Sequence, residues 1–313
     1  PAHARRQRAA MSANCPSAYH ISDKQMITVA TYNIHKAHSM TRGCHLNELK
    51  SGLKEMDADL ICLQEVQDIN TKRKSTILIE HGHSQVAALQ ANLYPHIAYG
   101  ANAIYEHGHH GNAILSKYPI EQWRNIDVSD HRLEQRGVLH ATLDHPVLGE
   151  VHVINSHFGL FKVSRIRQAY ALIRYVRCFV PPHAPLIVAG DFNDWNLYVH
   201  HILTRELLLQ DAIETIQRGL KPHVNSESNR LRRLVKNLTN TALAPTPFGT
   251  PKTVGRTFPS MIPWFKLDRL YVRGFEIAEA HVKMGAEWRN RSDHAPIQAT
   301  LKPALILPPS MKP

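Results

Sequence analysis

Short apolar runs that end abruptly in polar residues recur along this chain of 313 residues. Runs rich in β-branched residues and bounded by proline, glycine or polar clusters predict buried strands. They cover residues 26–34, 59–65, 96–105, 137–143, 150–155, 186–189, 266–272 and 297–301. Apolar residues at helical spacing predict helices near 46–56, 84–94 and 163–180. Strands that alternate with helices indicate an α/β protein whose ligand sites gather at strand ends.

This organisation loosens only between residues 217 and 255, where prolines accompany a basic stretch at 230–236. We expect an inserted basic loop that carries one short helix, within a single domain over residues 26–302. The hydrophobic fraction of 43% is ample for the core of such a domain. Residues 1–25 are predicted to be a disordered arm, and residues 303–313 a C-terminal tail.

For three stretches, the function that the sequence predicts depends on whether their side chains are buried or exposed. The helix predicted over 163–180 has apolar residues at Val163, Ile166, Tyr170, Ile173 and Val176. Its arginines, Arg165 among them, are expected on the solvated face. The run Met-Ile-Pro-Trp-Phe at 261–265 is expected in the core rather than on a membrane surface. The histidines of 107–112 are expected in a turn, where they would donate to a phosphate rather than bind zinc.

Polar side chains cluster where the predicted strands end. After the strand at 186–189, Gly190 precedes Asp191 and Asn193, whose spacing of two places both on one side of an extended segment. This stretch alone is compatible with either an Asx-type turn or a functional site. The polar residues at or beside strand ends are Asn33, Glu65, His157, Asp191, Asn193, Asp268, Asp293 and His294. Together they supply oxygen ligands for a divalent cation, imidazole with a carboxylate partner, and amide donors, as a phosphate-ester hydrolase requires.

The charge of the chain favours an anionic partner. The formal net charge is +11, which suits nucleic acid, a phosphorylated small molecule or an acidic membrane surface without choosing among them. The four cysteines have no metal-finger spacing and no dense framework, which indicates reduced thiols in a cytoplasmic protein. No signal-peptide core or membrane-spanning run is evident, and no obligate protein partner is inferred.

The order of these motifs carries a family resemblance. They are Thr-Tyr-Asn33, Leu-Gln-Glu65, Asn-Ser-His157, Gly-Asp191-Phe-Asn193, Leu-Asp268-Arg and Ser-Asp293-His294. Between about residues 26 and 301 the chain resembles the endonuclease/exonuclease/phosphatase superfamily, in particular an uncharacterised bacterial branch of it. The resemblance implies a DNase I-like fold, a four-layer α-β-β-α sandwich of two packed mixed sheets. It also implies Mg²⁺-dependent attack of water on phosphorus.

The resemblance assigns a metal site to part of this set. Glu65 is similar to the principal metal ligand of the family, supported by Asn33 and by Asp293. The repair branch of the family has a metal-binding aspartate where this chain has His35, which favours one Mg²⁺ ion, with Mn²⁺ as the alternative metal.

The remaining positions resemble the family's catalytic groups. Asp191 is similar to the residue that orients or deprotonates the attacking water, and Asn193 to the residue that holds a phosphate oxygen. His294, paired with Asp268, resembles the imidazole that activates water or holds the phosphate. His157 resembles an imidazole that protonates the leaving oxygen in several branches, whereas abasic-site endonucleases have tyrosine in that region.

These observations predict a Mg²⁺-dependent phosphodiesterase with nucleic acid as the first substrate class, because of the positive charge. The alternative is a phospholipid or sphingomyelin-type phosphodiesterase, or a phosphomonoesterase. In the lipid case, residues 261–265 and 230–236 would contact the bilayer. A catalytically silent phosphate-binding module is the third hypothesis.

Overall fold

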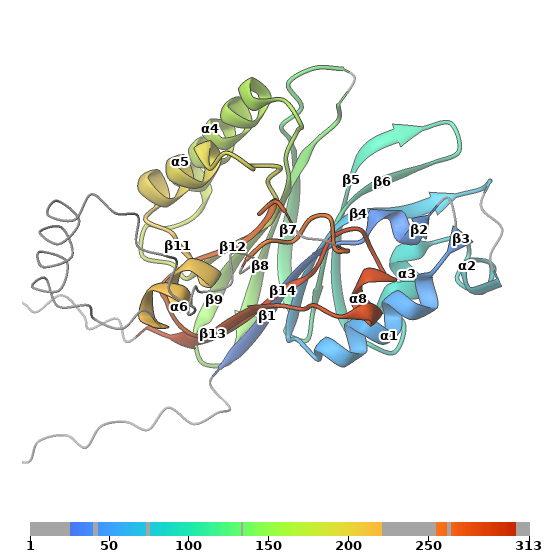
Figure 1. The fold of residues 1–313 in the computed structure, drawn as a ribbon, viewed down its shortest axis with the longest axis horizontal. Coiled ribbons are helices and arrows are strands. Elements are labelled where there is room, and N and C mark those ends of the chain that lie inside the picture. Colours follow the sequence, from blue (N-terminus) through green and yellow to red (C-terminus); the bar gives the residue numbers. More distant parts are fainter. Residues whose placement is uncertain are drawn as a thin grey trace, which may run out of the picture.

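In a computed structural model of the protein, two six-stranded sheets pack face to face, and helices cover their outer faces (Figure 1). The structure describes residues 26–39, 43–72, 76–132, 134–220, 255–261 and 264–304. The predicted four-layer α-β-β-α sandwich of two mixed sheets is thereby confirmed. No helix in these ranges is long and apolar enough to span a membrane.

The first sheet combines strands from both ends of the chain. Its order is β13 (Phe275–Val282), β14 (Ile297–Pro303), β1 (Ile27–Asn33), β4 (Leu60–Asn70), β6 (Gly108–Ser116) and β5 (His96–Tyr105). The helices on its side of the molecule are α1 (Leu46–Met56), α2 (Thr76–Glu80), α3 (Gln85–Gln90) and α8 (Ala286–Arg289). A short helical turn, η2 (His35–Ala37), and the small pair β2 (His38–Ser39) and β3 (Gly43–Cys44) follow β1.

The second sheet is built from the middle of the chain. Its order is β11 (Gln210–Asp211), β12 (Asp268–Arg273), β10 (Leu186–Asp191), β9 (Gly149–His157), β8 (Gly137–His145) and β7 (Ile120–Asp127). The helices α4 (Lys162–Phe179) and α5 (Tyr198–Leu207) cover its outer face. The helix α6 (Ala212–Leu220) packs against β12 and β13 at the open edges of the sheets.

Apolar residues fill the spaces between all four layers. Along β12, Leu270 and Val272 belong to the core between the sheets, whereas Tyr271 belongs to the core under α4 and α5. A third core, with Leu49 and Leu53 of α1, lies under the helices of the first sheet. Strands buried on both faces have few polar positions, which is why the sequence shows continuous apolar runs rather than alternation.

Strand pairing brings the predicted polar strand ends together. β1 runs parallel to β4, with Asn33 opposite Gln64, and β10 runs parallel to β9, with Asp191 opposite His157. The antiparallel strand β12 begins beside the same position, with Asp268 opposite Asp191. Parallel strands end at the same edge of a sheet, so both sheets present polar side chains at one end of the sandwich.

Three expectations about the elements need correction. Helix α6 continues to Leu220, so residues 217–220 are helical, and residues 221–254, with the basic stretch 230–236, lie outside the described residues. The arm 1–25 lies outside them too, as do residues 305–313. The histidines near 107–112 lie mostly on β6, which begins at Gly108. Strand β7 was not predicted, because it is a largely exposed edge strand without an apolar run.

Helix α4 turns a different face to the sheet than the pattern predicted. Val163 and Tyr170 are exposed, and the buried apolar positions are Ala169, Leu172, Ile173 and Val176. Arg165, expected in solvent, is only 1% exposed.

Candidate active site

Asp191 ends β10 and is held in a defined orientation by the turn that follows it. Its Oδ1 accepts a hydrogen bond from the Asn193 backbone N–H at 2.9 Å, which is the predicted Asx-type turn. Gly190 is required just before it, because a Cβ there would lie 1.9 Å from the Ser156 carbonyl oxygen. The turn and the site are therefore not alternatives: the turn engages one carboxylate oxygen and leaves Oδ2 for other partners.

Three side chains from three other segments approach Oδ2 of Asp191. The Asn33 amide donates to it at 3.0 Å, and Nε2 of His157 and Nε2 of His294 each lie 3.7 Å away. Burial raises the pKa of Asp191, while His294 lowers it and Asp268 raises it, and the pKa is about 6. Asp191 is therefore ionised at neutral pH and titrates close to it, as a general base should.

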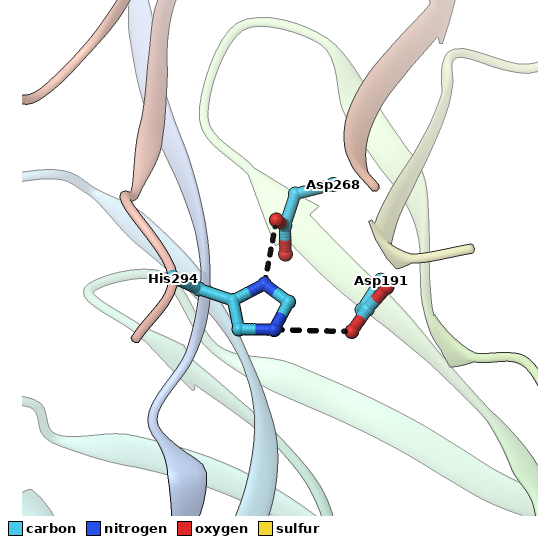
Figure 2. A group of neighbouring side chains, drawn as sticks. All are labelled: Asp191, Asp268 and His294. Atoms are coloured by element: carbon cyan, nitrogen blue, oxygen red, sulfur yellow. Dashed lines mark hydrogen bonds and ion pairs between the residues drawn. The ribbon is translucent and has the colours of Figure 1, made fainter. Parts of the chain in front are cut away.

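His294 lies between two carboxylates, as Figure 2 shows. Its Nδ1 is 2.8 Å from Oδ2 of Asp268, and its Nε2 faces Asp191. Burial alone would lower the pKa of His294, but the two aspartates more than offset that penalty and raise it to about 10. The ring is thus an imidazolium held in one orientation by Asp268.

Nε2 of His157 lies as far from Oδ2 of Asp191 as Nε2 of His294 does, but the His157 ring is neutral. Burial lowers its pKa well below the ordinary range, and the neighbouring charges of Arg136 and His294 add to that effect. No carboxylate is hydrogen-bonded to it in the described residues to compensate. The pocket therefore contains one charged and one neutral imidazole on either side of the same carboxylate oxygen.

Glu65 reaches the site through an irregularity in β4. The register with β6 shifts between Leu63 and Val66, and Glu65 has a positive φ of 55°. Such bulges re-aim side chains and are common beside active sites. Oε1 of Glu65 accepts from the Asn33 amide at 3.3 Å, and Lys36 Nζ lies 3.8 Å from Oε2. Asn33 therefore links the metal-ligand candidate Glu65 to Asp191.

Asp293 contacts His35 and lines a neighbouring pocket. Its Oδ1 forms an ion pair with Nδ1 of His35 at 3.1 Å, and both residues line a neighbouring pocket of about 300 Å³ together with Ser260 and Ser292. Asn33 is connected to that side as well, because its Oδ1 accepts from the His35 backbone N–H at 3.0 Å. The structure thus brings Asn33 and Glu65 together and places Asp293 beyond His35.

The donor chemistry fits a hard divalent cation on the Glu65 side of the pocket. The Glu65 carboxylate and the amide oxygen of Asn33 are ligands of the type that Mg²⁺ accepts, and an amide oxygen has a second lone pair beside the one His35 uses. Asp191, Asp268 and His294 are also close enough to hold a cation. An imidazole ligand must be neutral, however, and the raised pKa of His294 argues against that position.

The reactive groups open into a pocket of about 440 Å³ with one apolar wall. Besides Glu65, His157, Asp191, Asn193 and His294, it is lined by Arg136, Leu160, Trp195, Phe258, Phe265 and Leu267. Asn193 donates its side-chain amide to the Phe158 carbonyl at 2.9 Å, and the Nε of Arg136 donates to the same oxygen at 3.2 Å. The predicted catalytic residues all line the pocket except Asp268, which acts through His294.

Sequence reasoning missed Arg136 and the apolar wall. Arg136 precedes β8 in a connection whose fold is not evident from its pattern, and only the tertiary structure brings its charge next to His157. His110 of β6 lines an adjoining pocket together with Arg136. It is one of the histidines that the sequence predicted to donate to a phosphate. Lys36, whose Nζ lies 3.8 Å from Glu65, comes three residues after Asn33 in the sequence. This closeness to the Asn33 motif is a signal that could have identified Lys36 as a residue of the site.

A buried polar layer supports the site from below. Gln64 donates its side-chain amide to Oγ1 of Thr31 at 3.1 Å and to Oδ1 of Asn155 at 2.7 Å. Asn155 in turn donates to the carbonyls of Leu63 and Ala113, both at 2.8 Å. These hydrogen bonds join the two sheets directly beneath Glu65 and His157, where an apolar core alone would allow the sheets to slide.

The described residues of the run at 261–265 are exposed, which corrects the prediction of a core position. Met261 is 71% exposed, Trp264 is 66% exposed, and Phe265 is partly exposed at the pocket wall. The two residues between Met261 and Trp264 lie outside the described ranges. Phe265 therefore presents an apolar side chain to solvent at the pocket wall, and Met261 lines the neighbouring pocket.

A four-layer sandwich with this carboxylate, amide and imidazole set at its strand ends defines a class of phosphate-ester hydrolases. The chain belongs to the Endonuclease/Exonuclease/phosphatase family, whose model matches residues 30–294.

Individual relatives agree with this assignment. The chain is 34% identical over 275 residues to the uncharacterised protein YbhP of Escherichia coli, covering 87% of this chain and 95% of YbhP. It is 30% identical over 145 residues to an exodeoxyribonuclease of Bacillus subtilis, covering 46% of this chain and 50% of that protein. A family member from Beutenbergia cavernae has a similar fold, with a TM-score of 0.65 at 18% identity over 90% of this chain and 72% of that one. The predicted resemblance to the bacterial branch that includes YbhP is thereby confirmed.

Proposed function

We propose that this protein is a Mg²⁺-dependent phosphodiesterase that hydrolyses its substrate by direct attack of water. The observation that carries the proposal is the environment of one atom, Oδ2 of Asp191. It lies 3.7 Å from a charged imidazole, 3.7 Å from a neutral one, and 3.0 Å from the amide that contacts Glu65. A carboxylate so placed, with a pKa of about 6, can accept a proton from water at neutral pH.

In the proposed reaction, Asp191 orients the attacking water and takes its proton as the new phosphorus–oxygen bond forms. The His294 imidazolium and Arg136 stabilise the negative charge that develops on the phosphoryl oxygens. His157 has a single N–H when neutral and directs it to the leaving oxygen as the bond to phosphorus breaks. The leaving oxygen then takes a proton from solvent water in the open pocket, and Asp191 gives its own proton to the hydroxide that remains, which restores the carboxylate.

Glu65 and Asn33 are the residues we propose to hold the metal, with Asp293 as a further ligand from the neighbouring pocket. A divalent cation bound there supplies Lewis-acid stabilisation of charge on the phosphoryl group. The positively charged Nζ of Lys36 lies 3.8 Å from Oε2 of Glu65, beside these ligands. Mn²⁺ has similar ligand preferences and is expected to substitute for Mg²⁺.

Nucleic acid is the substrate class that we place first. The net charge of +11 suits a polyanion, and one relative is an exodeoxyribonuclease. A phospholipid is the second candidate, favoured by the exposed Met261 and Trp264 near the pocket. The cytoplasmic location stays a prediction.

Hydrolysis of bis(p-nitrophenyl) phosphate tests the reaction without assuming the natural substrate. We expect turnover with Mg²⁺ or Mn²⁺, none with EDTA, and none in the Asp191→Ala variant. Asp144→Ala, which removes an exposed carboxylate of β8, is the matched control and should behave as wild type. Absence of metal-dependent turnover by wild type here and on oligonucleotides and phospholipid vesicles would overturn the proposal.

A further inference from the structure

Trp195 provides a planar aromatic surface in the wall of the pocket. It follows the Asp191–Asn193 turn directly, lines the pocket and is 47% exposed. The guanidinium carbon of Arg165 lies over its ring, 4.2 Å from the centroid. One face of the indole is thus covered by a cation, while the side chain keeps substantial contact with solvent.

Arg165 makes this surface rigid, because the arginine itself is buried. It is 1% exposed, lies in the first turn of α4, and donates to the Leu160 carbonyl and, at 3.5 Å, to Oδ1 of Asn196. A buried guanidinium must find partners, and here the indole is one of them. The burial that contradicts the sequence prediction for Arg165 therefore has a consequence: it orients Trp195 beside the catalytic groups.

The same arrangement is repeated one helical turn away. Lys162 Nζ lies 3.6 Å from the ring centroid of Tyr198. Lys162 and Arg165 are three residues apart on α4, and Trp195 and Tyr198 are three residues apart at the start of α5. Tyr198 is also partly exposed. Two cation-backed aromatic rings thus lie three residues apart in the chain, the first of them in the pocket wall.

Exposed aromatic rings that are backed by cations match one ligand chemistry particularly well. Single-stranded nucleic acid offers planar bases that stack on aromatic rings and phosphates that pair with cations. Bases inside a duplex stack on each other and do not present their faces. Acyl chains of a lipid have no planar group for which an oriented ring would matter.

We propose that Trp195 stacks the nucleobase next to the scissile phosphate, so that the enzyme selects single-stranded or frayed nucleic acid over duplex. This inference rests on the proposed phosphodiesterase function. Arg165 acts as a positioning residue, and Tyr198 extends the surface to the next base.

Tryptophan fluorescence tests the contact directly. The chain has four tryptophans, and a base stacked on Trp195 should quench part of their emission. We expect a single-stranded oligonucleotide to quench the Asp191→Asn protein, which binds without cleaving. The quench should disappear when Trp195→Phe is added and persist with Trp123→Phe, a control on β7 that is 49% exposed and far from the pocket.

Affinity measurements on the same background show whether the base is what Trp195 recognises. With fluorescence anisotropy, Trp195→Ala should raise the Kd for a single-stranded oligonucleotide about tenfold. The same variant should leave the Kd unchanged for an oligonucleotide with abasic residues in place of bases. Trp195→Phe keeps a ring and should recover most of the affinity, and a melting curve of each variant shows that it is folded.

Several results would overturn the inference while leaving the phosphodiesterase intact. One is an equal loss of affinity for base-bearing and abasic oligonucleotides, and another is no loss for either. A third is quenching of Trp195 by brominated anionic phospholipid vesicles but not by oligonucleotide, which would assign the surface to a membrane. Failure of the phosphodiesterase proposal shows separately, as no metal-dependent turnover that Asp191→Ala abolishes.

Discussion

Two adjacent residues of β12, Asp268 and Arg269, each anchor a buried cluster of carboxylates and imidazole, on opposite faces of the same strand. Asp268 lies on the side of Leu270 and faces His294 and Asp191. Arg269 lies on the other side. Both clusters have three groups close enough to hold a cation, and two members of the first, Asp191 and His294, line the pocket of the candidate active site.

The second cluster already contains its cation. One nitrogen of Arg269 lies 2.9 Å from Asp211 and 3.1 Å from Glu214, and Nε2 of His200 lies 3.5 Å from Glu214. Tyr271 completes the group through Nδ1 of His200 at 3.3 Å. The carboxylates raise the pKa of Arg269 still further despite its burial. Arg218, 3.4 Å from Glu214, supplies a second positive charge, so two guanidinium groups balance the two carboxylates, and the group joins β12 to β11 and α6.

The first cluster lacks such a permanent charge and therefore has protons to exchange. Its cation is an imidazole, whose charge depends on Asp268 and Asp191, and its carboxylate Asp191 has a pKa of about 6. It also opens into a pocket. Buried charged groups of similar composition therefore predict different roles: a structural role where guanidinium groups balance the carboxylates, and a role in chemistry where titratable groups balance one another.

The largest expected effect is on catalysis by the first cluster. His294→Gln keeps a hydrogen bond to Asp268 but loses the charge, so kcat for a phosphodiester should fall about 10³-fold. Steady-state kinetics with Mg²⁺ measures this. His201→Gln, at an exposed position of α5, is the control. A kcat close to wild type in His294→Gln would remove the distinction between the clusters.

The second effect is on the stability of the protein, to which the second cluster contributes. Arg269→Met leaves two carboxylates without their cation, and the free energy of unfolding should fall by about 3 kcal/mol. The kcat of the protein that remains folded should be unchanged, because Arg269 faces away from the pocket. Urea unfolding and kinetics below the transition test both. Arg273→Met, four residues along β12 and less buried, should lose clearly less stability, and an activity loss in folded Arg269→Met would contradict the assignment.

The next effect is on metal binding at Glu65, beside the first cluster. Glu65→Gln should raise the Mg²⁺ concentration for half-maximal activity by about 10–100-fold, because a neutral amide is a weaker ligand for a hard cation. A Mg²⁺ titration of activity measures it. Glu121→Gln, exposed on β7, is the matched control. An unchanged Mg²⁺ dependence in Glu65→Gln would move the metal to another position.

The smallest effect is on the pH dependence of stability without metal. The pKa of His294 is about 10 when folded against an ordinary 6.5, so its stabilising contribution is complete below pH 6.5 and is lost as the pH rises towards 10. Between those values wild type should lose roughly a few degrees of Tm more than His294→Gln. Thermal melts in EDTA measure this. Parallel profiles would show that His294 is not charged.

Much of the site follows from local sequence because strands end where polar residues interrupt an apolar run. Asn33, His157 and Asp191 were predicted at strand ends and lie there, and parallel pairing brings such ends to one edge of a sheet. The Asx turn after Asp191 is also local, since it needs only residues two apart. Edge strand β7 lacks the apolar signal, which is why its position was not predictable.

Contacts between distant segments needed the tertiary structure. Asn33 and Asp191 are 158 residues apart, and only the packing of the two sheets places the amide of one on the carboxylate of the other. Arg165 reads as a surface arginine, because helical periodicity does not show which neighbour will cover it. Met261 reads as a core residue, because hydrophobicity does not distinguish a buried side chain from one at a pocket rim.

The sequence by itself therefore determined the alternation of strands and helices, many of the strands and the kinds of chemical group at their ends, because these depend on periodicity and residue type. The four layers followed from the family resemblance of its motifs. Only the tertiary structure decided which imidazole is charged. His157 and His294 are the same residue type at the same 3.7 Å from Asp191, and their pKa values move in opposite directions. The physical reason is the Asp268 carboxylate, 2.8 Å from Nδ1 of His294, whose charge acts together with that of Asp191 and for which His157 has no hydrogen-bonded counterpart in the described residues.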